Sequence, residues 1–121
     1  MPLPDDDSLL LLHNPRCSKS RAALALLEER GVDFAVRAYL DEPLDASELE
    51  ALRQRLGRPA GEWVRRAEQA YAEAGLDPDA DEASILAAMA GHPILIERPV
   101  LVRGPRAVVG RPPERVLELL E

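Results

Sequence analysis

The sequence predicts an α/β fold: a small mixed four-stranded sheet with helices on both sides and a helical insertion. Residues 9–40 read as strand, helix, strand, residues 45–91 carry helical patterns, and two short strands and a last helix follow. A chain of 121 residues is long enough for one hydrophobic core and short for two. We therefore expect a single domain, residues 1–121, with residues 45–91 as its helical insertion.

The amino end predicts a strand followed by a helix. Residues 1–7 are acidic and are expected to form a frayed leader. Leu9–Leu12 is a continuous apolar run, which is typical of a short strand buried on both faces. Ala23 and Leu27 share one face of a helix, and Gly31 stands where that helix is expected to end.

Residues 32–40 predict the second strand of a βαβ unit. Apolar residues alternate with others along this stretch: Val32, Phe34, Val36, Ala38 and Leu40 against Asp33, Arg37 and Tyr39. Alternation with a period of two is the pattern of a strand.

Three helices are predicted between residues 45 and 91. Asp45 with Glu48 resembles a capping box at the start of the first. Each helix has apolar positions at helical spacing and a glycine at its end: Leu49, Leu52 and Leu56 before Gly57; Trp63, Val64, Ala67 and Tyr71 before Gly75; Ile85 and Met89 before Gly91.

The carboxyl end predicts a hairpin and a closing helix. Val100–Val102 and Ala107–Val109 flank the turn residues 103–106. Pro112 or Pro113 opens the last helix, whose inner side carries Val116, Leu119 and Leu120.

The composition limits the classes of binding partner and the cellular compartment that we expect for the protein. The net charge of −7 and the pI of about 4.9 give no general positive field for nucleic acid or an anionic membrane, so an anion needs a local pocket. The longest apolar run is too short for a membrane span, the acidic start is unlike a secretory signal, and one cysteine cannot form an internal disulfide. We expect a cytoplasmic protein that binds neither nucleic acid nor membrane.

Cys17, in the stretch HNPRCSKSR, lies where the first strand is expected to give way to the first helix. Free amide groups and the dipole at a helix start lower the pKa of a thiol and attract a tetrahedral oxyanion. A lone cysteine is usually a small core residue, but these neighbours are polar and charged. The sequence therefore predicts a nucleophile and an anion site at one place.

Three other cysteine chemistries fit poorly. A dithiol motif would need a second cysteine where Ser20 stands, so a resolving thiol must come from another molecule. A cysteine phosphatase loop would need arginine where Ala23 stands. Cys17, His13 and His92 lack the spacing of a metal site, so we expect no metal.

Three motifs, His13–Arg21, His92–Pro99 (HPILIERP) and Gly110–Glu114 (GRPPE), resemble in this order the glutaredoxin-coupled arsenate reductases of the thioredoxin-like superfamily. The likeness runs from the first strand to the last helix. It implies a thioredoxin-like fold with a helical insertion, which agrees with the elements above. The basic residues beside the cysteine and the chain end at Glu121 resemble a short subgroup, for which arsenate activity is often inferred.

The resemblance implies a reaction and its residues. The family's nucleophile falls on Cys17, and the positions that assist it fall on His13 and Ser20. The thiolate would attack arsenate or a similar oxyanion, and glutathione with glutaredoxin would resolve the adduct and release arsenite. Glutathione is then a co-substrate, no cofactor is bound, and a monomer is expected.

The resemblance also implies three arginines that bind the oxyanion. Two fall on Arg98 and Arg111, and the third on Arg65, with Arg66 as the adjacent alternative. A guanidinium suits a multiply charged oxyanion because it donates two parallel hydrogen bonds. The bond from Arg98 to Pro99 matches a cis-proline element of the family.

Two further functions stay open. One is a thiol reductase that uses Cys17 on another substrate and does not act on arsenate. The other is a regulator that binds RNA polymerase, as the Spx-type members of the superfamily do. Those members usually have a Cys-x-x-Cys pair here, whereas this chain has Ser20.

Overall fold

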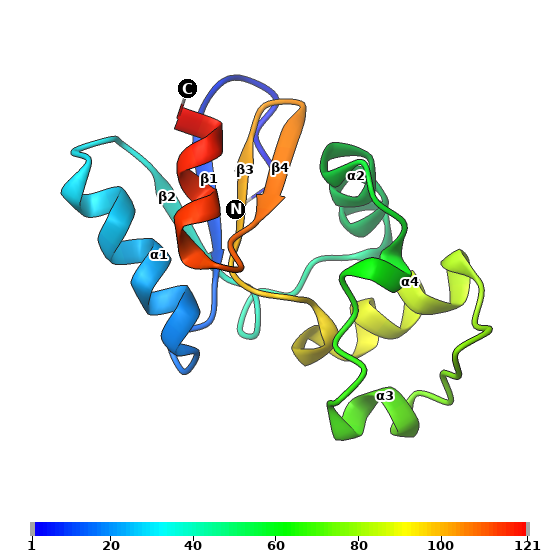
Figure 1. Ribbon diagram of the computed structural model, residues 1–121. Coiled ribbons are helices and arrows are strands. Elements are labelled where there is room, and N and C mark those ends of the chain that lie inside the picture. The colour runs from blue at the N-terminus through cyan, green and yellow to red at the C-terminus, as the bar shows by residue number, and fades with distance from the viewer. Residues whose placement is uncertain (1, 121) are drawn as a thin grey trace.

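Figure 1 shows the computed structural model, in which helices cover both faces of a four-stranded sheet. The strands are β1 (Leu9–His13), β2 (Ala35–Ala38), β3 (Val100–Arg103) and β4 (Arg106–Val109). Their order is β2-β1-β3-β4, with β2 parallel to β1 and the other two pairs antiparallel. The predicted mixed sheet is confirmed. The structure describes residues 2–120, so whatever the predictions say of Met1 and Glu121 lies outside it.

One face of the sheet is covered by α1 (Ser18–Glu29) and η3 (Pro113–Leu120). The core between them is aliphatic: Leu9, Leu11, Ala23, Leu27, Leu101, Val108, Val116 and Leu119. The closing helix is present as predicted, but it is wound as a 3-10 helix. This core fixes α1 against β1, and the loop between them contains Cys17.

The other face is covered by α2 (Ala46–Leu56) and α4 (Glu82–Gly91). The capping box of Asp45 and Glu48 is present, and α2 ends in the left-handed Gly57, at φ 66°. The sheet contributes Leu10, Leu12, Val100 and Val102 to this second core. No helix within residues 2–120 is long and apolar enough to cross a membrane.

The helix predicted from Trp63 to Tyr71 is wrong in its first half. The chain there makes a 3-10 turn, η1 (Ala60–Glu62), and then an extended segment in which Val64 bridges Ile96. Helical structure returns only at α3 (Gln69–Glu73). The Trp63 carbonyl accepts the amide of Glu97 at 3.0 Å, and the amide of Arg65 donates to the Leu95 carbonyl at 2.7 Å. These long-range bonds replace helical ones and place residues 63–65 beside residues 95–97.

The second strand is shorter than residues 32–40, and its burial departs from the sequence pattern. Val36 is 39% exposed, whereas Arg37 is 4% and Tyr39 0% exposed. Arg37 is buried at low cost because its guanidinium donates to two backbone carbonyls, of Glu42 and Pro43, and to the carboxylate of Glu48. Tyr39, which follows β2, is likewise buried in the interior.

Within residues 2–7, the leader is held in place at Leu3 and Pro4 rather than frayed. Leu3 is buried in the core on the α2 side. Arg55 of α2 donates to the Pro4 carbonyl at 3.1 Å and to the Gly104 carbonyl at 2.8 Å. One side chain therefore ties the leader to the hairpin between β3 and β4.

Candidate active site

Cys17 is the N-cap residue of α1. Its extended backbone, at φ −97° and ψ 124°, ends the loop from β1, and its carbonyl accepts the amide of Arg21 at 3.0 Å. Its own amide donates to the Asn14 carbonyl at 3.0 Å, which closes the loop into a turn. The side chain is half-buried and makes no capping bond. The thiol is therefore accessible at the start of a helix, as the sequence predicts.

The pKa of Cys17 is lowered from its ordinary value. Burial raises the pKa, but the amides of Ser20 and Lys19 and the guanidinium of Arg98 together outweigh that effect. Two of these groups are amides at the helix start, which point toward a negative charge. More of the thiol is therefore ionised at neutral pH than in a free cysteine.

A buried network supports the loop beneath the cysteine. His13 Nδ1 and Ser20 Oγ lie 2.7 Å apart, and the amide of Asn14 donates to the same hydroxyl at 3.0 Å. Burial, helped by the charge of Arg21, lowers the pKa of His13, so the ring is neutral at pH 7. Among residues 2–120 no hydrogen bond joins His13 to Cys17. His13 and Ser20 therefore stabilise the loop that leads to the cysteine.

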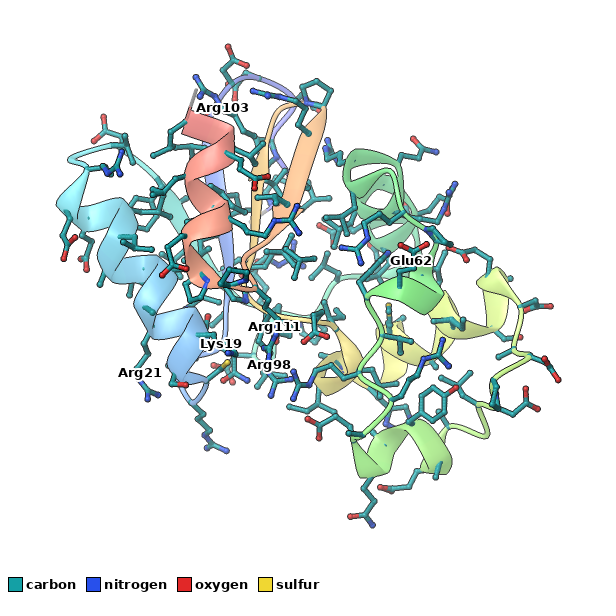
Figure 2. The ribbon with its side chains drawn as sticks, viewed as in Figure 1. Lys19, Arg21, Glu62, Arg98, Arg103 and Arg111 are labelled. Atoms are coloured by element: carbon teal, nitrogen blue, oxygen red, sulfur yellow. The ribbon has the colours of Figure 1, made fainter. Side chains whose placement is uncertain are left out.

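Arg98 lies close enough to the start of α1 to lower the pKa of Cys17, and Arg111 lies next to Arg98 (Figure 2). Arg98 follows the 3-10 turn η2 (Pro93–Leu95), and its peptide bond to Pro99 is cis, as the resemblance implies. Arg111 follows β4 and donates to the Arg98 carbonyl at 3.0 Å. The segment that enters β3 and the segment that leaves β4 lie at the same end of the sheet and thus bring Arg111 next to Arg98.

Two carboxylates tie three arginines into one cluster. Glu97 accepts from Arg65 Nη1 at 2.8 Å and lies 3.3 Å from Arg111 Nε. Glu68 accepts from Arg65 Nε at 3.1 Å and lies 3.7 Å from Arg98 Nη2. The structure therefore brings together the three arginines that the sequence singled out. Glu68 and Glu97 were not identified from the sequence, because acidic side chains are not expected in a site that binds an anion.

Arg65, and not Arg66, belongs to this cluster. The guanidinium of Arg66 donates to the Gly61 carbonyl at 3.0 Å and to the Tyr71 hydroxyl at 3.1 Å. It also lies over the Tyr71 ring, 5.8 Å from its centre. A hollow of about 240 Å³ opens beside the cluster, lined by Val64, Arg65, Arg66, Ala67, Glu97 and Arg111.

Tyr39 is a further residue at this site that the sequence pattern did not single out. Ala38, the last residue of β2, pairs with His13, the last residue of β1, so Tyr39 leaves the sheet beside the cysteine loop. Burial raises the pKa of Tyr39 to about 12, with smaller effects from Arg98 and Cys17. Tyr39 could have been identified from its position directly after a predicted parallel strand, because functional side chains are common at the carboxyl ends of such strands.

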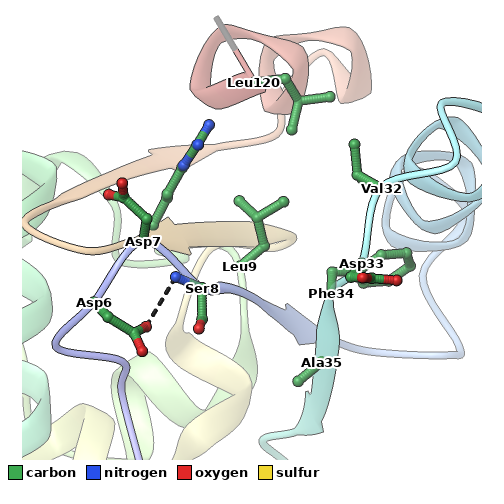
Figure 3. Close-up of a pocket in the computed structure, with 10 residues that line it drawn as sticks. Asp6, Asp7, Ser8, Leu9, Val32, Asp33, Phe34, Ala35 and Leu120 are labelled. Carbon is green, nitrogen blue, oxygen red and sulfur yellow. Dashed lines mark hydrogen bonds between the residues drawn. The ribbon is translucent and has the colours of Figure 1, made fainter.

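A larger hollow, of about 870 Å³, lies at the other end of β1 from the cysteine loop (Figure 3). Its lining combines apolar side chains with three carboxylates and one arginine: Asp6, Asp7, Ser8, Leu9, Val32, Asp33, Phe34, Ala35, Arg103 and Leu120. Carboxylates repel an oxyanion, so this hollow is a poor anion site. Within residues 2–120 no three His, Cys, Asp or Glu side chains are grouped to hold a metal.

Comparison with known proteins agrees with this architecture. The signature of the ArsC family matches residues 12–119. A protein named arsenate reductase from Neisseria meningitidis serogroup A is 47% identical over 112 residues, which are 91% of this chain and 96% of that protein. The uncharacterized protein YfgD of Escherichia coli K12 is 46% identical over 91% of this chain and 94% of its own length.

A solved structure gives the same result for the fold. The structure titled arsenate reductase from Vibrio cholerae superimposes with a TM-score of 0.88 at 44% identity, over 94% of this chain and 98% of that one. The predicted thioredoxin-like fold is thus confirmed. The order of motifs, the sheet and these matches along nearly the whole chain show that the protein belongs to the ArsC family.

Proposed function

We propose that the protein reduces arsenate, with Cys17 as the nucleophile. The observation that carries the proposal is the half-buried thiol at a helix start, whose pKa Arg98 and two amides lower. Arg65, Arg98 and Arg111 gather three positive charges against the two carboxylates of Glu68 and Glu97, in an otherwise acidic protein. Relatives named arsenate reductase, such as that of Neisseria meningitidis, support the choice of substrate.

In the first step the Cys17 thiolate attacks arsenic. A sulfur–arsenic bond forms and an arsenic–oxygen bond breaks, so that one oxygen leaves as water after protonation. The arginines and the amides at the start of α1 balance the charge of the oxyanion, which otherwise repels a thiolate. Arsenic is still in its pentavalent state in this adduct.

In the second step an external thiol supplies the missing electrons. Glutathione thiolate attacks the Cys17 sulfur, a disulfide forms, and the sulfur–arsenic bond breaks with its electron pair left on arsenic. Arsenic is reduced by two electrons and leaves as arsenite, while two thiols are oxidised to one disulfide. Glutaredoxin then takes the glutathione from the mixed disulfide and restores the Cys17 thiolate.

The external thiols follow from the cysteine count. Cys17 is the only cysteine of the chain, and Ser20 stands where a second thiol of the motif would be. A disulfide within the chain is therefore excluded, and each turnover consumes thiols from other molecules.

A coupled assay tests this function. Oxidation of NADPH is followed with arsenate, glutathione, glutaredoxin and glutathione reductase, for the wild type and for Cys17→Ser. We expect arsenate-dependent turnover by the wild type and none by the variant. Wild-type turnover no faster than that of Cys17→Ser would remove arsenate reduction from the account.

One observation favours a second candidate, a thiol reductase that acts on another substrate. Glu68 and Glu97 already form ion pairs with the three arginines, and both accept hydrogen bonds from Arg65. An oxyanion must displace or share these carboxylates, whereas a neutral disulfide substrate need not. Reduction of a small mixed disulfide by Cys17, with no turnover of arsenate, would select this candidate.

A further inference from the structure

Three buried side-chain nitrogen or oxygen atoms in residues 2–120 have no hydrogen-bond partner: Tyr39 Oη, Arg98 Nε and Arg103 Nε. Buried polar groups are nearly always paired, since an unpaired one keeps the full cost of losing its water. Arg103 ends β3 at the far end of the sheet, where Figure 2 labels it. The other two atoms belong to residues that interact electrostatically with Cys17.

The backbone places Tyr39 at the active site. The parallel register of Ala38 with His13 sets the end of β2 beside the loop that leads to Cys17. The Tyr39 side chain is 0% exposed, so its hydroxyl has no access to bulk water. The side chain of Asn14 lies near the hydroxyl and slightly lowers the pKa of Tyr39, but the two groups do not meet the geometry of a formed hydrogen bond.

Several donors of the arginine cluster are paired within the protein. Arg65 donates to Glu68 and Glu97, and Arg98 Nη1 donates to the Ile94 carbonyl at 3.3 Å. Arg98 Nε and Tyr39 Oη are left as the buried donors without an acceptor. A ligand that brings oxygen atoms to the cysteine would supply the acceptors that the free protein lacks.

We propose that Tyr39 is a substrate-binding residue whose hydroxyl donates a hydrogen bond to an oxygen of the tetrahedral oxyanion held at Cys17. This inference rests on the proposed function, because it assumes that an oxyanion binds there. The hydroxyl adds a donor without adding charge. It stays protonated at neutral pH, so Tyr39 serves as a donor and not as a base.

Calorimetric titration with arsenate tests the proposal in a background that cannot react. The parent is Cys17→Ser, compared with Cys17→Ser/Tyr39→Phe and with Cys17→Ser/Tyr71→Phe. Tyr71 is the other tyrosine of the chain, and its hydroxyl accepts from Arg66 outside the cluster. We expect Tyr39→Phe to weaken arsenate binding by about tenfold or more, as for other hydrogen bonds to charged groups, and Tyr71→Phe to leave it unchanged.

Thermal unfolding without arsenate supplies the second readout. Removal of an unpaired buried hydroxyl costs the free protein nothing, so Tyr39→Phe should melt at the parent's temperature or above it. Equal affinity of parent and Tyr39→Phe would overturn the inference alone. A Tyr39→Phe chain that melts lower or does not fold would also overturn it, since the fold itself would then use the hydroxyl. A parent that binds no arsenate would contradict both the inference and the proposed function.

Discussion

The charge of the Cys17 thiol depends on groups that are far apart in the sequence. Two amides belong to α1, whose N-cap residue is Cys17, whereas Arg98 lies in the segment before β3. The helix amides are a local consequence of the strand–loop–helix order. Arg98 is present only in the folded chain, so it is the group whose effect can be removed without changing the helix.

Replacement of Arg98 tests this dependence. In Arg98→Gln we expect the pKa of Cys17 to rise, because a positive charge that stabilises the thiolate is lost. The rate of alkylation by iodoacetamide, measured against pH, should have its midpoint at higher pH than in the wild type. Arg106→Gln is the control, since Arg106 is exposed in the hairpin. An unchanged midpoint in Arg98→Gln would contradict the assigned role of the guanidinium.

At the scale of elements, Gly110 sets the distance between the end of β4 and the segment before β3. A Cβ atom at Gly110 would lie 2.8 Å from Pro99 Cγ and 2.8 Å from Val116 Cγ1. Its amide donates to the Pro99 carbonyl at 2.7 Å. The close approach of these backbones is what brings Arg111 next to Arg98.

We expect Gly110→Ala to lower stability by about 1–3 kcal/mol, the usual effect of overpacking, and to weaken oxyanion binding by moving Arg111. Chemical denaturation and arsenate titration measure the two effects. Gly91→Ala is the matched control, because a Cβ atom there meets nothing within 4 Å at the end of α4. Equal stability of the two variants would show that the contact with Pro99 does not constrain the chain.

The pairing of Arg37 with Glu48 links β2 to the start of α2. The bond from Arg37 Nη1 to Glu48 Oε2 is 2.6 Å long, and Arg37 lowers the pKa of Glu48, against the effect of burial. A carboxyl whose pKa is lower in the folded state contributes stability above its unfolded pKa, near 4.5, and this is lost as pH falls through the folded value.

The pH dependence of the unfolding free energy should reveal the contribution of the Arg37–Glu48 pair. We expect the wild type to lose stability as pH falls below about 4.5, and Glu48→Gln to be less stable at pH 7 but to lose less on acidification. Unfolding free energies from denaturant titrations at several pH values give both curves. Glu29→Gln, at an exposed position at the end of α1, is the control. Parallel curves for the wild type and Glu48→Gln would contradict the linkage.

At the scale of the whole molecule, the features that the sequence predicted correctly are those that neighbouring residues determine. The apolar run of β1, the capping box of α2 and the position of Cys17 at the start of α1 each depend on a few neighbouring residues, and each is present. The sequence also named the three arginines that the fold brings together, through the resemblance of separated motifs. Their binding roles stay predictions.

What the sequence did not predict depends on distant partners. Trp63 and Val64 fit a helical pattern, but backbone bonds to residues 95–97 hold them extended. Arg37 fits an exposed position, but carbonyls that follow β2 pair its guanidinium in the interior. Tyr39 looks like a strand residue until the register of β2 with β1 places it at the cysteine loop. None of these contacts has a signature within a short window.

The molecule as a whole is acidic, with a net charge of −7, yet ion pairs hold the arginine cluster together, and its members Arg98 and Arg111 lie at one end of the sheet (Figure 2). A distant oxyanion therefore meets a repulsive field, which salt screens. In the function we propose, capture of the oxyanion depends on the cluster at short range and on Cys17.

Mass spectrometry of Cys17 after incubation with arsenate and glutathione, with glutaredoxin left out, tests the central claim most directly. The account predicts that a glutathione disulfide accumulates on Cys17 only when arsenate is present, together with an equal amount of arsenite. Cys17 that stays unmodified, or that is modified equally without arsenate, would contradict it.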